Sequence, residues 1–100
     1  MHINTNVVNN RVIVELAGSM YVEGAELLRE KLIKCMEEGQ QHFLIKMANV
    51  DYIDSSGLGV LVSIHKRTRQ ANGSLVISGI TGFVKELFEL TRLDKVFTME

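Results

Sequence analysis

The sequence contains no proline and only one cysteine, Cys35. A single cysteine excludes an internal disulfide, which is typical of a protein from a reducing compartment. The chain also lacks repeats, low-complexity tracts and any stretch that resembles an interdomain linker. Its 100 residues suffice for one domain, so we expect a single domain over residues 1–100.

The sequence also has no large excess of either charge, since the formal net charge is -1 and the pI is near 6.3. This balance gives no electrostatic basis for binding nucleic acid or an anionic membrane. No apolar run approaches the ~20 residues that span a bilayer. The first six residues lack the basic and apolar regions of a signal peptide. We therefore expect a cytoplasmic protein with neither nucleic acid nor membrane as a partner.

Apolar residues in the first part of the chain are spaced as in a hairpin followed by a helix. Residues 3–8 and 11–17 flank Asn9-Asn10, a pair typical of turns, and Gly18 is expected to end the second strand. Residues 22–38 place apolar side chains three and four apart, which predicts an amphipathic helix that ends at Gly39.

The later elements continue the alternation of strand and helix. Strands are predicted at residues 42–47 and 74–78, with a short last strand at Val96-Phe97. Helices are predicted at residues 56–71 and from residue 81 or 82 to about 90. The fold class is therefore α/β: a mixed sheet of four to five strands, with about three helices packed mainly on one face.

The most unusual stretch is residues 50–62, where acids, hydroxyls and glycines interrupt the apolar pattern. We expect it at a surface where a strand ends and a helix begins. Ser55 or Ser56 would then be the N-cap, with Ser56 the preferred one. Gly57 and Gly59 each cost about 1 kcal/mol relative to alanine in a helix. Either a partner approaches the backbone closely there, or a neighbouring element packs against it.

Several other residues have a structural and a functional interpretation. A phosphate on the exposed serines would meet free helix amides, at the positive end of the helix dipole. Cys35 is expected in the core, and His65 is expected to be partly buried and hydrogen-bonded. Met20 and Tyr21, if exposed, would form an apolar rim beside the serines.

The sequence lacks the residue patterns that a catalytic site or a metal site would need. The nucleophile elbow requires glycine two residues before the serine, but Ile53 precedes Ser55 in this way and Asp54 precedes Ser56. None of His2, His42 and His65 belongs to a catalytic motif. Asp51 and Asp54 have no companion ligands that would complete a metal site. We therefore expect no enzyme activity, no metal and no cofactor.

Residues 52–61, with the sequence Tyr-Ile-Asp-Ser-Ser-Gly-Leu-Gly-Val-Leu, resemble the signature of STAS-domain anti-sigma factor antagonists. The resemblance extends over nearly the whole chain and includes residues 16–18, 25–32, 72–75 and 87–97. In that family the serine after the aspartate accepts phosphate, which corresponds to Ser55. The resemblance also implies a STAS-like fold.

The resemblance implies a switch operated by partners. An anti-sigma factor that is also a serine kinase would phosphorylate Ser55 with its own ATP, and a phosphoserine phosphatase would reverse the reaction. The unphosphorylated chain, a monomer or weak dimer, would bind the kinase and release the sigma factor. The surface expected to contact the partner comprises Met20, Tyr21, Asp54, Ser56, Gly57, Leu58 and Gly59.

The chain departs from the family at residues 18–21. Members often carry Gly-Glu-aliphatic-Asp there, whereas this chain has Ser19 and Tyr21 in place of the two acids. A divergent kinase partner or a different switching system would account for this change. The alternative function is a STAS scaffold component of a larger signalling assembly, without a reversible switch.

Overall fold

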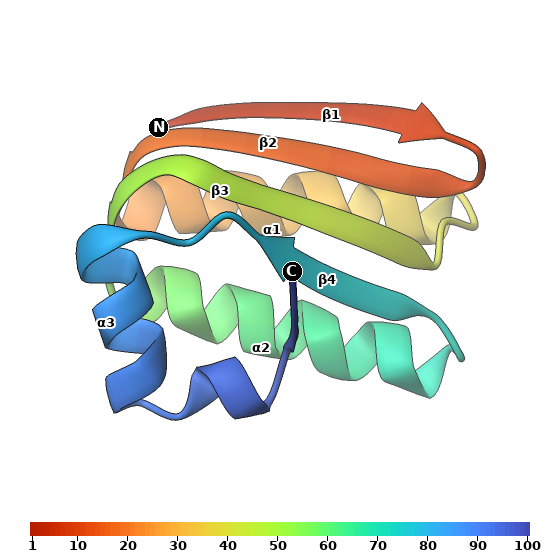
Figure 1. Cartoon of the computed structure of the whole chain (residues 1–100). Helices are drawn as coiled ribbons and strands as arrows, with labels where there is room; N and C mark the ends of the chain where they lie inside the picture. Colours follow the sequence, from red (N-terminus) through yellow and green to blue (C-terminus); the bar gives the residue numbers. More distant parts are fainter.

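The computed structural model describes residues 1–100, in which strands and helices alternate after an initial hairpin (Figure 1). The strands are β1 (His2–Val8), β2 (Arg11–Met20), β3 (His42–Ile53), β4 (Ser74–Ser78) and β5 (Thr98–Met99). The helices are α1 (Val22–Glu37), α2 (Ser55–Gln70), α3 (Gly82–Leu90) and the 3-10 turn η1 (Leu93–Lys95). The predicted α/β class is confirmed.

The five strands form one mixed sheet in the order β1-β2-β3-β4-β5. Only β1 is antiparallel to its neighbour, and β2, β3, β4 and β5 are all parallel. The parallel strands therefore end at the same edge of the sheet, where α1, α2 and α3 begin (Figure 1, left). This edge is called the carboxyl edge below.

The hairpin between β1 and β2 forms at the predicted pair of asparagines. Asn9 and Asn10 both adopt left-handed backbone conformations, with φ of 51° and 63°. Two successive positive φ values are those of a two-residue type I′ turn, whose twist matches that of paired strands. Asparagine is one of the few residues that tolerate this conformation.

Helices α1 and α2 pack side by side on one face of the sheet (Figure 1). The buried residues of α1 are Ala25, Leu28 and Leu32, which repeat at the predicted spacing. The inward positions of the strands alternate, as in Val12, Val14 and Leu16 of β2. The buried residues of α1, of the strands and of α3 form one hydrophobic core on the helical side of the sheet.

Two strands are longer than predicted. Gly18 does not end β2: it lies in an irregular stretch of the β2–β3 pairing with φ of 100°, and the strand continues to Met20. Strand β3 does not end at Met47 but extends to Ile53. Polar residues at its exposed positions obscured the continuation, because only Val50 and Ile53 among its last four residues are buried.

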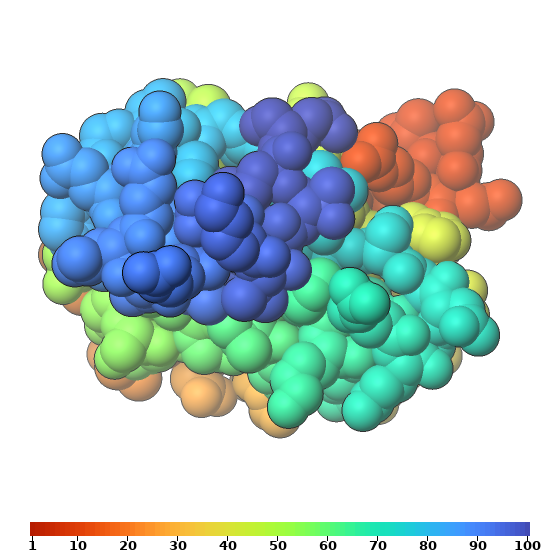
Figure 2. All heavy atoms as spheres, turned by 60° about the horizontal axis from the view of Figure 1, so that its bottom comes forward, coloured from red at the N-terminus to blue at the C-terminus, as the bar shows by residue number.

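The C-terminal part differs from the prediction in two places. Leu90, the apolar residue at the end of the third predicted helix, does not pack against the core but is 82% exposed. The last strand is Thr98–Met99, while Phe97 lies in the core against Phe88. Figure 2, seen from the side of α2 and α3, shows the C-terminal residues (dark blue) lying against α3.

None of the helices is both long enough and apolar enough to cross a lipid bilayer.

Candidate functional site

The junction between β3 and α2 contains a single residue, Asp54, and so has almost no loop. Its backbone is extended, and its side chain accepts hydrogen bonds from the amides of Ser56 (3.0 Å) and Gly57 (3.3 Å). Asp54 is therefore the N-cap of α2, and the prediction that Ser55 or Ser56 caps the helix is wrong. A carboxylate at this position also interacts favourably with the positive end of the helix dipole.

Ser55 is the first residue of α2 and is exposed. Its hydroxyl takes part in no hydrogen bond within the chain. Because Asp54 supplies the cap, the Ser55 oxygen is not needed to complete the helix. It is thus accessible for chemistry, with the helix N-terminus directly behind it.

The two glycines of the first turn of α2 differ in their surroundings. A Cβ at Gly57 would lie 2.6 Å from Cγ1 of Ile53 and 2.7 Å from the sulfur of Met20. Gly57 is buried, and close packing within the chain explains why a residue without a side chain stands at this position. Gly59 is exposed, and a Cβ there would meet nothing within 4 Å. Only Gly59 leaves room on the outside for another molecule.

Met20 and Tyr21, predicted together as an exposed apolar rim, have opposite environments. Met20 is 0% exposed, so this part of the prediction is wrong: its side chain fills the space over Gly57. Tyr21 is 54% exposed at the N-terminus of α1. Leu58 is half-buried and packs against the core.

A carboxylate from the neighbouring strand lies beside the segment that lacks the expected acids. The Ser19 hydroxyl donates to Oδ1 of Asp51 at 2.8 Å. The amide of Asp54 donates to the carbonyl of Met20 at 3.2 Å, so the end of β2 is joined to the residue before Ser55. The sequence shows Asp51 only as a metal-ligand candidate without companion ligands, because the strand pairing that brings it to Ser19 is not visible there.

Three exposed aromatic rings line the carboxyl edge, and the sequence pattern did not reveal them as a group. The ring of Tyr52 lies 5.3 Å from that of Tyr21 and 5.3 Å from that of Phe83, between centroids. Tyr52 and Phe83 are stacked at 10°. Tyr21 lies between β2 and α1, Tyr52 lies at the end of β3 and Phe83 lies at the start of α3, so only the fold brings them together. We call Tyr21, Tyr52 and Phe83 the aromatic ladder.

Acidic side chains outnumber basic ones at this edge, although exposed Lys85 in the first turn of α3 and the N-terminal amine next to Gly18 are positive. Residues 18–28 and 47–65 contain no lysine or arginine, and residues 73–84 contain no charged residue. Exposed Glu23 and Asp51 and the half-buried Asp54 lie in these segments. A protein that binds at the carboxyl edge would therefore contact apolar rings with carboxylates nearby.

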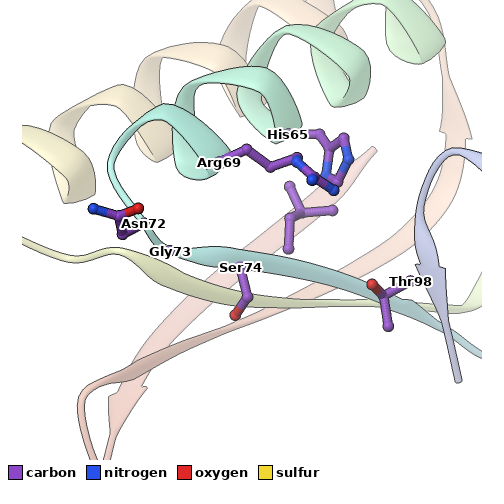
Figure 3. A pocket seen from close by; sticks show the side chains of 7 residues that line it. His65, Arg69, Asn72, Gly73, Ser74 and Thr98 are labelled. Carbon is purple, nitrogen blue, oxygen red and sulfur yellow. The ribbon is translucent and has the colours of Figure 1, made fainter.

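A hollow of about 380 Å³ lies near the opposite end of α2 (Figure 3). In Figure 3 Arg69 extends toward His65, whereas Asn72 and Ser74 point away from them. The Ser74 hydroxyl is instead within 2.9 Å of Nδ1 of His42. The polar groups do not converge, so the hollow offers no set of groups that would hold a ligand.

His65 was predicted to be partly buried and hydrogen-bonded, but it is buried and its Nδ1 has no hydrogen-bond partner. Its ring packs edge-on against Phe97, with centroids 5.1 Å apart. Burial, and next the charge of Arg69, lower the pKa of His65 below its ordinary 6.5, and hydrogen bonding to the backbone of Val96 opposes them. His65 is thus a neutral packing residue.

Cys35 was expected in the core but lies at its margin, half-buried. Burial, and then the charge of Glu38, raise the pKa of its thiol, which disfavours a reactive thiolate. The structure contains no group of three or more His, Cys, Asp or Glu residues that could hold a metal ion.

The fold and the serine-bearing helix N-terminus define a class of protein. Residues 2–100 match the STAS domain family, and the chain belongs to that family. The predicted resemblance to STAS-domain anti-sigma factor antagonists is confirmed by the relatives.

The chain is 36% identical over 98 residues to the anti-sigma-B factor antagonist of Bacillus subtilis, covering 96% of this chain and 89% of the relative. It is 30% identical over 93 residues to the anti-sigma-B factor antagonist of Staphylococcus aureus, covering 93% and 86%.

Solved structures agree on the fold. The crystal structure of TM1081 from Thermotoga maritima matches with a TM-score of 0.91 at 23% identity, covering 97% of this chain and 84% of that one. Unphosphorylated SpoIIAA, an anti-sigma factor antagonist, matches with a TM-score of 0.81 at 16% identity, covering 99% and 87%. Its phosphorylated form, from Bacillus, also matches with a TM-score of 0.81.

Proposed function

We propose that this chain is an anti-sigma factor antagonist that is switched by phosphorylation of Ser55. The observation that carries the proposal is the exposed Ser55 hydroxyl at the first position of α2, unused by the fold because Asp54 provides the cap. The similarity to curated anti-sigma-B factor antagonists supports it. The chain acts by binding, without catalysis, in the cytoplasm.

In its unphosphorylated form the chain binds an anti-sigma factor serine kinase, and the kinase then releases its sigma factor. The first turn of α2 contributes Asp54, Ser55, Ser56, Leu58 and Gly59 to this contact. The kinase supplies ATP, and the Ser55 oxygen attacks the γ-phosphorus as the bond to ADP breaks. The serine proton passes to a base of the kinase.

Phosphorylation ends the interaction through charge. A phosphoserine adds about -1.5 to -2 charges at neutral pH. At Ser55 this charge would lie beside the carboxylate of Asp54, and removing both negative groups from water at the interface would be costly. A phosphoserine phosphatase restores the hydroxyl and the binding-competent form.

The test uses purified chain, ATP and each anti-sigma factor kinase encoded in the same genome. Mass spectrometry should locate one phosphate on Ser55. Ser55→Ala should remain unmodified, whereas Ser56→Ala, the matched control for the site of phosphorylation, should still carry its phosphate on Ser55. A phosphate on another residue, with Ser55→Ala still fully modified, would contradict the site.

The phosphomimetic Ser55→Asp separates a switch from a scaffold. We expect its affinity for the kinase to fall at least tenfold, measured by isothermal titration calorimetry. An unchanged affinity would instead support the STAS scaffold component as the function of this chain.

A further inference from the structure

We propose that the aromatic ladder of Tyr21, Tyr52 and Phe83 is the anchor on which the kinase docks, and that it selects a kinase with an apolar surface surrounded by basic residues. This inference rests on the proposed function, because it assigns the kinase of Ser55 as the occupant. It concerns residues outside the first turn of α2, on three other segments of the chain.

The rings of the ladder are exposed to water, which is unfavourable for apolar surface. Tyr21 is 54%, Tyr52 36% and Phe83 47% exposed, and Val22 next to the ladder is also exposed. Scattered apolar residues on a surface are ordinary, but a contiguous group marks an interaction site. Tyrosine and other aromatic residues supply much of the binding energy at protein interfaces.

The aromatic ladder lies close to Ser55. Tyr52 lies three residues before Ser55, on the strand that leads directly into α2. Tyr21 follows Met20, whose carbonyl accepts from the amide of Asp54. Phe83, in the first turn of α3, is stacked on Tyr52 with ring centroids 5.3 Å apart. A protein that reaches Ser55 therefore comes next to the ladder.

The charges around the ladder favour a different protein, rather than a second copy of this chain, as the occupant. A symmetric dimer through the ladder would bring Glu23 and Asp51 of one copy toward the same acids of the other. Like charges facing each other across an interface oppose association. A partner with arginine or lysine around an apolar centre complements both the rings and the carboxylates.

The rings of the ladder restrict one another before a partner binds. Tyr52 lies between the two other rings, stacked on Phe83 at 10° and tilted by 35° to Tyr21. Side chains that are ordered beforehand lose less conformational entropy on binding. The ladder thus presents a preformed surface.

The experiment measures phosphorylation of Ser55 by the kinase identified above, with Tyr21→Ala and Phe83→Ala as the test variants. For each we expect KM to rise about tenfold, the effect of an interface residue that matters, while kcat stays within twofold. Leu90→Ala is the matched control, since Leu90 is a large apolar residue at the far end of α3, 82% exposed. It should leave both constants unchanged.

Further variants keep the test independent of folding. Tyr52→Phe preserves the ring and should behave like the parent, whereas Tyr52→Ala should resemble Phe83→Ala. Thermal unfolding of every variant shows whether the fold is intact. A basic rim on the partner also predicts that the KM of the parent rises between 50 and 300 mM salt.

The outcomes distinguish the two proposals. If no kinase phosphorylates Ser55 in the parent, the proposed function fails. If Ser55 is phosphorylated normally but KM is within twofold of the parent for Tyr21→Ala and Phe83→Ala, the docking proposal alone is overturned. A parental dimer in sedimentation velocity that Phe83→Ala dissociates would identify a second copy as the occupant and also overturn it.

Discussion

The sulfur of Met20 lies 2.7 Å from the point where a Cβ at Gly57 would be built. The end of β2 and the start of α2 are therefore in direct contact through a residue without a side chain. This packing holds α2 against the sheet at the place where Ser55 is exposed. It also assigns different roles to two glycines that look alike in the sequence.

Substitution of these glycines should have opposite effects on stability. Gly57→Ala overpacks the contact with Met20 and Ile53 and should cost about 1–3 kcal/mol. Gly59→Ala meets open space and should gain about 0.5–1 kcal/mol from better helix propensity. Urea unfolding of both variants measures the difference. Equal effects of the two substitutions would show that the contact is not tight.

Replacing the N-cap should destabilise α2. Asp54→Ala removes the acceptor for the amides of Ser56 and Gly57 and should cost about 1 kcal/mol. Asp54→Asn, which keeps the acceptor, should retain most of the stability. Ser56→Ala should change little, and a larger loss for Ser56→Ala than for Asp54→Ala would assign the cap to the serine instead. Thermal unfolding at pH 7 is a suitable measurement.

His65 should make the fold sensitive to mild acid. Its pKa is lowered in the folded chain, so the unfolded chain binds more protons as the pH falls below about 6.5. Stability should therefore decrease as the pH is lowered from 7.5 to 5.5. We expect a smaller decrease for His65→Leu, with the exposed His2→Gln as control, in urea unfolding at several pH values. Identical pH profiles for His65→Leu and the parent would contradict the assignment.

Replacing Arg92 with glycine should increase the stability of the fold more than the same replacement at any other residue. Its φ of 61° is left-handed, a conformation that costs a side-chain-bearing residue about 1–2 kcal/mol. Arg92→Gly should raise the free energy of unfolding by about 0.5–1 kcal/mol after the greater freedom of the unfolded chain is counted. Arg92→Ala, which keeps a Cβ, should show no gain. A less stable Arg92→Gly variant would contradict this account.

Periodicity and turn residues were sufficient to predict the main elements of the fold. The spacing of Ala25, Leu28 and Leu32 gives α1, and Asn9-Asn10 gives the hairpin, because both signals are local. The end of β3 was missed because its last residues face water on one side. The strand at residues 98–99 was missed because Phe97, the apolar residue there, belongs to the core.

The candidate site was predicted in part. The exposed serine before a helix follows from local sequence, and the exposure of Tyr21 is as predicted. The cap was assigned to a serine, because propensity alone does not separate serine from aspartate. The burial of Met20, the Ser19–Asp51 hydrogen bond and the aromatic ladder depend on strand register and on contacts between distant segments. These relationships have no signature in a single sequence.

The near absence of a loop between β3 and α2 has a consequence for how Ser55 can be recognised. Kinases that read linear motifs pull an extended segment into their active site, but Ser55 is fixed between a paired strand and a helix. A synthetic peptide of residues 48–62 has neither the sheet nor the packed helix. We expect it to be phosphorylated at least a hundredfold less efficiently than the folded chain. The kinase then recognises the folded domain as its substrate. Ser55 would therefore be protected from kinases that recognise only a linear sequence motif.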